Sequence, residues 1–114
     1  MIKIFGIKNC DTVKKALKWL AVEGIEHSYH DFRKDGLDEA TLRAMLDDVG
    51  LDLLLNKRGT TWRKLPDDVK DNVTPERAVA LMLSEPAMIK RPVWHKNGTY
   101  FVGFKATEQE KLKT

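Results

Sequence analysis

Apolar residues in the first third of the chain change their spacing twice. Residues 2–7 hold a dense run of β-branched and aromatic side chains, which predicts a short buried strand. From Val13 to Ala21 apolar residues recur at intervals of three and four, the spacing of one helix face, and Gly24 follows as a C-terminal stop. Residues 25–32 predict a second extended segment. The chain is therefore expected to open with a strand, a helix and a strand.

The next segment carries signals for both the start and the end of a helix. Asp38 predicts the N-cap, because its side-chain oxygens can accept hydrogen bonds from the first free N–H groups. Residues 42–49 form a second helical apolar stripe, and Gly50 closes it. Residues 51–55 predict a short helix or a turn.

The rest of the central part combines a basic loop with another helix. Residues 56–64 have no apolar period and predict a loop. Thr74 followed by Pro75 predicts a helix start, and Pro86 its stop. The buried stripe of this helix is expected to comprise Ala78, Leu81 and Met82.

The C-terminal part predicts a hairpin and a final helix. Extended residues at 93–96 and 99–102 flank Asn97-Gly98, a pair that tolerates the positive φ angles of a type I′ turn. Thr107 with Glu110 three residues later predicts a capping box.

The order of these elements predicts an α/β fold. Strand, helix and strand, then a helical middle, a β-hairpin and a helix, form the thioredoxin-like layout: a mixed sheet with a C-terminal β-hairpin and a central helical insertion. The first crossover joins parallel strands and should be right-handed. The functional site is therefore expected at the C-terminal end of the first strand.

Length and composition favour a compact soluble protein. A chain of 114 residues leaves room for one domain, spanning 1–114, and 42% apolar with 32% charged residues disfavours disorder and fibrous repeats. The net charge of +3 is too small to imply nucleic-acid or membrane partners, and no stretch approaches the ~20 apolar residues of a membrane span. We expect a cytoplasmic monomer with no nucleic-acid or membrane partner. The chain has one cysteine, which excludes a disulfide within it.

Charge is unevenly distributed along the chain. Residues 35–55 carry six acids against Arg43 alone, whereas 56–64 contain four basic residues and no acid. A second basic group lies near the C-terminus and comprises Lys90, Arg91, Lys96 and Lys105. If the fold brings the two basic groups together, they form a positive pocket for a small anion; scattered, solvated side chains are an equally weighted alternative.

Cys10 is the candidate nucleophile. It stands where the first strand meets the first helix, and free N–H groups and the helix dipole there favour the thiolate. Lys8 and Lys14 add positive charge nearby. A lone cysteine is often simply a buried apolar residue. The position between strand and helix favours the nucleophile over that alternative.

The residues after Cys10 indicate a monothiol cycle. The run is Cys10-Asp11-Thr12-Val13, with no second cysteine to resolve an adduct, so the resolving thiol must come from glutathione or another protein. Thr12 could donate its hydroxyl to the thiolate or to a bound oxyanion, or could be an ordinary first-turn residue.

Several other side chains could bind an anionic partner. Arg91 precedes Pro92, and an X-Pro bond beside a hairpin can be cis and present the backbone to an extended peptide. Arg58 and Arg63 can bind oxyanions or carboxylates, although surface arginines are often only solvated. The spacing of the three histidines relative to Cys10 suggests no metal site.

Four segments, in order, resemble the glutaredoxin-coupled arsenate reductase (ArsC) family, and within it the YffB-type proteins. The resemblance covers nearly the whole chain. The segments are GIKNCDT at 6–12, LNKRGTTWRKL at 55–65, MIKRP at 88–92 and VGFK at 102–105.

This resemblance implies a fold and a chemistry. The family has a thioredoxin-like fold with a helical insertion, and its nucleophilic cysteine matches Cys10. Its oxyanion-holding arginine matches Arg91, and the proline matching Pro92 is typically cis. For the YffB type the resemblance implies a glutathione-dependent thiol reductase with no bound cofactor. Glutathione is the expected co-substrate and partner, and glutaredoxin is a further candidate partner. The expected substrate is a small oxyanion or a disulfide. The predicted site therefore comprises Cys10 as nucleophile and Lys8, Thr12, Arg58, Arg91 and Pro92 as substrate-binding residues.

Departures from the family pattern leave the substrate open. Gly6 stands where arsenate reductases of this type carry a histidine, and Asn56 stands at the position of a middle-loop arginine, with Arg58 two residues away. Val102-Gly103 covers the place of a late arginine. A genuine arsenate reductase is one alternative. Another is a non-catalytic interaction protein resembling the Spx regulators, although Val13 replaces the second cysteine of their sensor pair.

Overall fold

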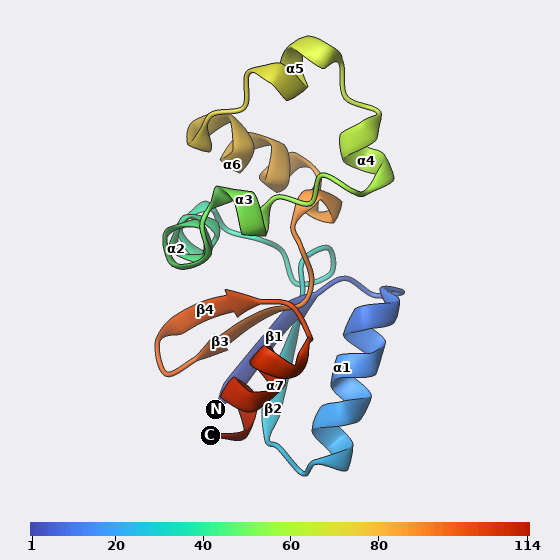
Figure 1. Cartoon of the computed structure of the whole chain (residues 1–114), viewed down its shortest axis with the longest axis vertical. Coiled ribbons are helices and arrows are strands. Elements are labelled where there is room, and N and C mark those ends of the chain that lie inside the picture. Colours follow the sequence, from blue (N-terminus) through green and yellow to red (C-terminus); the bar gives the residue numbers. More distant parts are fainter. The chain divides into compact units, whose positions relative to one another are not determined.

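The computed structural model describes all of residues 1–114, which form two compact units (Figure 1). We call Met1–Gly36 with Arg91–Thr114 the sheet unit, and Leu37–Lys90 the helical unit. The helical unit is the central insertion predicted from the order of elements.

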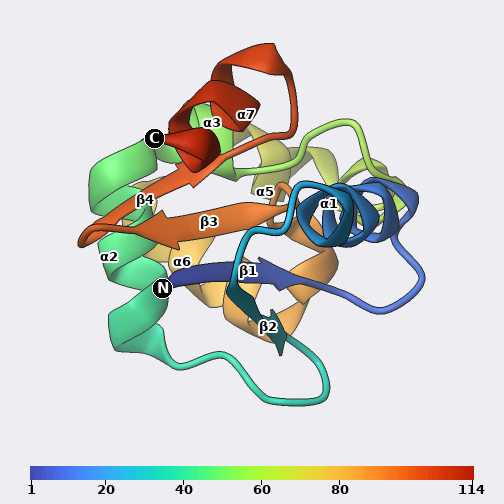
Figure 2. The same ribbon diagram turned by 90° about the horizontal axis from the view of Figure 1, so that it is seen from below.

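The sheet unit contains four strands and two helices. Strand order is β2-β1-β3-β4, with β1 parallel to β2 and the other pairs antiparallel (Figure 2). This is the thioredoxin-like mixed sheet predicted from the sequence, and the hairpin has the predicted bounds. The elements are β1 (Ile2–Gly6), α1 (Asp11–Val22), β2 (His27–Asp31), β3 (Val93–Lys96), β4 (Thr99–Val102) and α7 (Ala106–Lys113).

Helices α1 and α7 pack on one face of the sheet (Figure 2). Trp94 of β3 is fully buried there, and its indole Nε1 donates a hydrogen bond to the Gly103 carbonyl at 2.7 Å. This bond satisfies the polar atom of a side chain that otherwise contributes apolar area. The buried cluster consists of Ile2, Ile4, Ala16, Leu20, Trp94 and Leu112.

The opposite face of the sheet carries aromatic side chains. The ring centroid of Phe5 on β1 lies 5.1 Å from that of His30 on β2 and 6.0 Å from that of Tyr100 on β4. Phe5 is itself nearly fully buried. Alternation along β1 thus directs Ile2 and Ile4 to one face and Phe5 to the other.

The helical unit confirms both predicted N-caps. Asp38 Oδ1 accepts from the Thr41 N–H at 2.6 Å, and Thr74 Oγ1 accepts from the Arg77 N–H at 3.3 Å. Gly50, at φ 91°, ends the first of these helices as predicted. The elements are α2 (Glu39–Val49), α3 (Leu51–Leu54), α4 (Thr60–Arg63), α5 (Asp67–Asp71), α6 (Pro75–Ser84) and the 3₁₀ helix η1 (Pro86–Met88).

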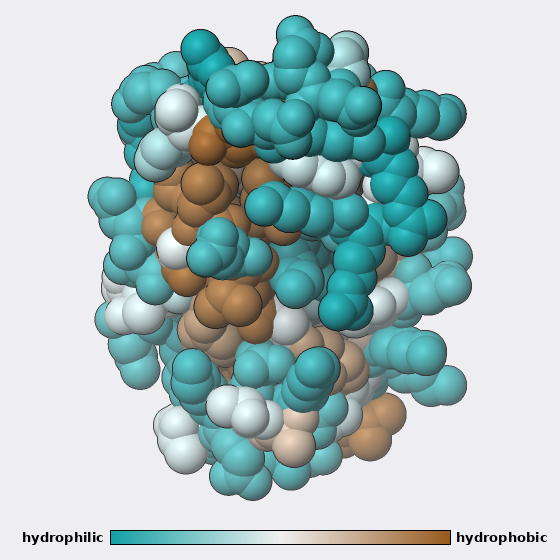
Figure 3. All heavy atoms as spheres, turned by 45° about the horizontal axis from the view of Figure 1, so that its top comes forward, coloured by the Kyte–Doolittle hydropathy of each residue, from teal (hydrophilic) through white to brown (hydrophobic).

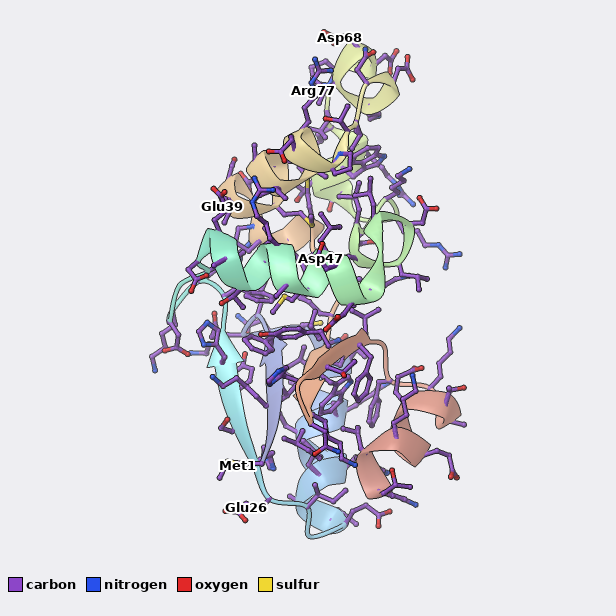
Figure 4. The ribbon with its side chains drawn as sticks, turned by 90° about the vertical axis from the view of Figure 1, so that its left-hand side faces the viewer. Met1, Glu26, Glu39, Asp47, Asp68 and Arg77 are labelled. Carbon is purple, nitrogen blue, oxygen red and sulfur yellow. The ribbon has the colours of Figure 1, made fainter.

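An ion-pair network joins α2 to α6. The Arg43 guanidinium donates to both oxygens of Glu76, at 3.0 and 2.9 Å, and to Glu39 at 2.9 Å. Figure 4 labels Glu39 on α2. Hydrogen bonds from Arg43, and then its charge, hold the pKa of the Glu76 carboxyl below its usual range. These contacts fix the relation of the two longest helices of this unit.

Two elements of the helical unit differ from the sequence prediction. The segment 56–64 is not wholly a loop, because Thr60–Arg63 form the helical turn α4 and its Trp62 is buried. The helix α5 was not predicted. Both helices are too short to show an apolar period, which explains why the pattern missed them.

The buried face of α6 differs in part from the prediction. The helix ends at Ser84, two residues before the predicted stop Pro86, which begins η1. Val79 is buried instead of Leu81, which is half-buried, while Ala78 and Met82 are buried as predicted.

The start of the final helix differs as well. The N-cap of α7 is Lys105, two residues before Thr107, the predicted N-cap. The Glu108 carboxylate accepts from the Lys105 N–H at 2.8 Å, so Glu108 has the role predicted for Glu110. Gly103 precedes this cap at φ 108°, a backbone angle that favours glycine.

Most of the face shown in Figure 3 is hydrophilic, with brown apolar side chains open to solvent in places. None of the helices has the length and apolar character needed to cross a membrane.

Candidate active site

Three segments of the sheet unit meet at one end of the sheet. Strands β1 and β2 are parallel and pair through Gly6 and Asp31, so the loop to Cys10 and the turn after Asp31 leave the sheet at the same end. Strand β3 is antiparallel to β1, and their last pair is Phe5 with Val93. The preceding Arg91–Pro92 therefore enters the sheet at this end too. The carboxyl ends of parallel strands are where sites are expected in α/β folds, so the structure supports the predicted location.

Cys10 is the N-cap residue of α1 and is half-buried. Its carbonyl accepts the first helical hydrogen bond, from the Lys14 N–H at 3.0 Å, and its side chain makes no capping bond. Asn9 has a φ of 73°, which turns the chain sharply between Lys8 and the helix. The thiol thus stands at the N-terminus of α1, where the first backbone N–H groups have no acceptor within the helix.

Gly6 permits an unusually close approach of α1 to β1. A Cβ atom at this position would be 2.6 Å from Cγ2 of Val13, the fourth residue of the Cys10-Asp11-Thr12-Val13 run. A side chain at position 6 therefore requires α1 or Val13 to move. The departure from the arsenate reductase pattern noted at Gly6 thus coincides with a position that has no space for a side chain.

The carboxylate of Asp31 holds the loop that leads to Cys10. Asp31 is 5% exposed, and its Oδ2 accepts from the Lys8 N–H at 2.9 Å and from the Tyr29 hydroxyl at 3.3 Å. Its Oδ1 accepts from the N–H groups of Arg33 and Lys34, at 2.8 and 3.0 Å. A single side chain therefore connects the end of β2 with the segment two residues before Cys10.

These hydrogen bonds also govern the ionisation of Asp31. Burial on its own would raise the pKa of the carboxyl, but the backbone donors of Lys34, Arg33 and Lys8, with the Tyr29 hydroxyl, outweigh it and lower the pKa. The group is therefore held as a carboxylate. The sequence analysis did not predict this role for Asp31. An Asp between a strand and a turn is nevertheless a known signal, because its side chain can accept hydrogen bonds from nearby backbone N–H groups.

Four of the predicted binding residues lie with Cys10 in the sheet unit. Lys8 is exposed on the loop, and Thr12 is exposed in the first turn of α1. Arg91 is half-buried at the start of β3, and the Arg91–Pro92 bond is cis, as the resemblance implies. The Pro92 carbonyl accepts from the Gly103 N–H at 3.0 Å, which ties the proline to the end of β4.

Arg58, the remaining predicted residue, belongs to the helical unit. It is exposed, and its N–H donates to Asn56 Oδ1 at 3.1 Å. The Asn56 N–H in turn donates to the Met88 carbonyl at 2.7 Å, beside the bridge between Leu55 and Ile89. This defines the local position of the basic loop, and the orientation of Arg58 toward Cys10 stays a prediction.

A cleft lies in each unit. A cleft of about 670 Å³ in the helical unit is lined in part by Asp68 of α5 and Arg77 of α6, both labelled in Figure 4. A cleft of about 320 Å³ in the sheet unit is lined in part by Lys8 and Asn9 of the Cys10 loop. Cys10 lines neither of these clefts, but it directly follows Asn9, so the second cleft adjoins the loop that carries the candidate nucleophile.

Relatives with known sequences extend over nearly the whole chain. An uncharacterised protein of Haemophilus influenzae is 47% identical over 110 residues, with 96% of both chains covered. The global transcriptional regulator Spx of Streptococcus mutans is 24% identical over 110 residues, covering 95% of this chain and 80% of the regulator.

Solved structures agree with the fold described above. A protein named YffB has a TM-score of 0.92 at 38% identity and covers all of both chains. An arsenate reductase (ArsC) related protein from Brucella melitensis has a TM-score of 0.81 at 49% identity, covering 99% of this chain and 94% of the other. The sequence model of the ArsC family matches residues 5–112. This match covers nearly the whole chain, so the chain belongs to the ArsC family.

Proposed function

We propose that this arsenate reductase-like thiol protein is a glutathione-dependent thiol reductase. The observation that carries the proposal is the position of Cys10, the single cysteine of the chain, half-buried as the N-cap of α1 beside Lys8. The thiol is partly exposed and therefore within reach of a partner in solvent. Without a second cysteine, a complete cycle needs a thiol from outside the chain.

The proposed cycle consists of two thiol–disulfide exchanges. The Cys10 thiolate attacks the glutathione sulfur of a mixed disulfide; the Cys10–glutathione disulfide forms and the substrate thiolate leaves. A glutathione thiolate then attacks the glutathione sulfur of that adduct, which regenerates the Cys10 thiolate and releases glutathione disulfide. Overall, one free glutathione thiol is consumed, the substrate thiol is released, and the glutathione of the mixed disulfide leaves in glutathione disulfide, so that one disulfide bond breaks and one forms.

The other predicted residues bind rather than react. Arg91, Arg58 and Lys8 hold anionic groups of the partner, the two arginines by paired N–H donors and the lysine as a point charge. Thr12 can donate its hydroxyl at the helix start, and Pro92 shapes the surface on which an extended peptide lies. The protein needs no bound cofactor in this cycle, and glutaredoxin is a second candidate for resolving the adduct.

Arsenate is the alternative substrate suggested by relatives. The Brucella melitensis protein is described as related to an arsenate reductase. In that reaction two thiols, Cys10 and a glutathione, would supply the electrons that convert arsenate to arsenite. The absence of room for a side chain at Gly6 favours a disulfide substrate over arsenate.

A regulatory role is the alternative from another class. The match to Spx suggests a protein that binds a partner without turnover. The discriminating variant is Cys10→Ser, because a thiol reductase loses all turnover while an interaction protein keeps its binding.

The test is steady-state reduction of the mixed disulfide between glutathione and β-mercaptoethanol, with consumption of glutathione coupled to glutathione reductase. We expect the wild-type protein to accelerate the reaction and Cys10→Ser to abolish that acceleration, by at least about 100-fold. Val13→Cys, which places a cysteine at the position of the resolving thiol, tests the monothiol cycle. Equal rates for wild type and Cys10→Ser would contradict the proposal.

A further inference from the structure

A cleft beside the Cys10 loop is lined by three cationic side chains. Its volume is about 320 Å³, and its walls come from the loop after β1 and the turn after β2. All of its lining residues belong to Met1–Gly36, one continuous stretch of the sheet unit. They are Ile7, Lys8, Asn9, Asp31, Arg33 and Lys34.

The cations of this cleft are available to a ligand. Lys8, Arg33 and Lys34 are exposed. None of these three side chains takes part in the ion pairs formed by Arg43 and Lys113. An unpaired arginine and two lysines around one hollow attract an anion.

The single carboxylate in the lining does not compete for these side chains. Both oxygens of Asp31 accept hydrogen bonds, from the N–H groups of Lys8, Arg33 and Lys34 and from the Tyr29 hydroxyl. Asp31 thus directs the backbones of the three cationic residues while their side chains stay free to turn into solvent. Three positive charges face one negative charge in the lining. Asp35, whose Oδ2 accepts from the Asp31 N–H at 2.9 Å, adds a second carboxylate nearby, so positive charge still exceeds negative charge.

The cleft is close to the nucleophile. Only Asn9 separates Lys8 from Cys10 along the chain, and Asn9 itself lines the cleft. Gly6 and Asp31 are paired at the ends of the parallel strands β1 and β2, so the loop to Cys10 and the turn after β2 leave the sheet at the same end.

We propose that this cleft binds a carboxylate of the thiol or disulfide partner of Cys10, with Arg33 and Lys34 as binding residues beside Lys8. The inference rests on the proposed function for the identity of the partner. Arg33 can form paired hydrogen bonds with a carboxylate, and the lysines add point charges. The cleft would favour thiols that carry a carboxylate at some distance from the sulfur, as glutathione does, over neutral or cationic thiols.

The test separates binding from reaction by using the Cys10→Ser protein and S-methylglutathione, which keeps both carboxylates and has no reactive sulfur. NMR titration at low salt measures the Kd and locates the amides that shift. We expect shifts at Lys8, Asn9, Arg33 and Lys34. The additional changes Arg33→Ala and Lys34→Ala together should raise the Kd about five- to tenfold.

Lys18→Ala is the matched control, because Lys18 is an exposed cation of α1 that does not line the cleft. It should leave the Kd within about twofold. The proposal is overturned if S-methylglutathione fails to bind, if Lys18→Ala weakens binding as much as the double change, or if the shifted amides lie elsewhere. Binding in the cleft combined with no turnover by the wild-type protein would overturn the reductase function alone and leave the cleft assignment intact.

Discussion

At the end of β2, the buried carboxylate of Asp31 accepts a hydrogen bond from the N–H of Lys8, two residues before the nucleophile. It also accepts from Tyr29, Arg33 and Lys34, so four donors from two segments depend on one side chain. Asp31 is accordingly a positioning residue. It holds the loop in the conformation that presents Cys10 at the start of α1.

We expect Asp31→Asn to lower the free energy of unfolding by about 1–3 kcal/mol at neutral pH, because a side-chain amide cannot accept from all four donors. Urea denaturation measures the loss. Asp71→Asn, an exposed change in α5, should have an effect below about 0.5 kcal/mol. Equal effects would show that the Asp31 network does not stabilise the fold.

The same variant has a predicted pH dependence. Folding lowers the pKa of the Asp31 carboxyl. The ionised carboxylate therefore stabilises the folded state fully at pH values above the pKa of an unfolded Asp, and this stabilisation is lost as the pH falls through the lowered pKa of the folded state. The stability difference between wild type and Asp31→Asn should be constant from about pH 5 to 8 and should shrink below about pH 4. A difference that grows on acidification would contradict the assigned direction.

Arg91 and Lys105 offer a second comparison of single residues. Both belong to the sheet unit, at the starts of β3 and α7, but only Arg91 is predicted to hold an anionic group. Arg91→Ala should weaken S-methylglutathione binding to the Cys10→Ser protein about tenfold, and Lys105→Ala by less than about twofold. Isothermal titration provides the two constants. Equal losses would place Arg91 outside the binding site.

At the scale of elements, the contact between β1 and α1 determines where Cys10 stands. Gly6 and Val13 approach so closely that an added Cβ would lie 2.6 Å from Cγ2 of Val13. The helix start, and with it the thiol, is therefore set by the absence of a side chain at position 6.

Gly6→Ala should destabilise the protein by about 1–3 kcal/mol, because overpacking forces a shift of α1. Combining it with Val13→Ala removes the clashing methyl groups. The double variant should then lose less stability than the sum of the two single variants, by at least about 1 kcal/mol. Strictly additive losses in urea denaturation would mean that the two positions do not compete for space.

The elements that the sequence predicted are those with local signals. The Asn97-Gly98 hairpin, the Asp38 cap and the Thr74-Pro75 start each depend on residues adjacent in sequence, and the structure confirms all three. The helical turn at Thr60–Arg63 was missed because four residues cannot display a helical period. Asp31 was missed because its role depends on Lys8, which is distant in sequence and close only after β1 and β2 pair.

The candidate site shows the same division. The candidate role of Cys10 follows from its place between a strand and a helix, and Arg91–Pro92 was singled out by the X-Pro pair before the hairpin. Arg33 and Lys34 resemble ordinary surface charges in the sequence. Only the pairing of β1 with β2 shows that they share a cleft with Lys8.

At the scale of the whole molecule, the chain combines a sheet unit that contains Cys10 with a helical unit that contains the basic loop. One domain over 1–114 stays a prediction. Arg58, in the basic loop of the helical unit, is predicted to hold an anionic group of the partner of Cys10.

Arg58→Ala tests this contribution against Arg63→Ala, the neighbouring arginine of the same basic segment. We expect Arg58→Ala to reduce kcat/KM for a glutathione mixed disulfide about five- to tenfold, because a charge that holds the partner is lost. Arg63→Ala should reduce it less than about twofold. Equal reductions would indicate general attraction by a basic surface, and no reduction would remove Arg58 from the site.

The central claim, that Cys10 carries a reversible glutathione adduct, is tested most directly by intact-mass measurement. Wild type and Cys10→Ser are incubated with glutathione disulfide at neutral pH and then with reduced glutathione. We predict rapid addition of one glutathione to the wild type, no addition to Cys10→Ser, and removal of the adduct by the reduced thiol. A folded wild-type protein that forms no adduct would contradict the account and would make Cys10 a structural residue.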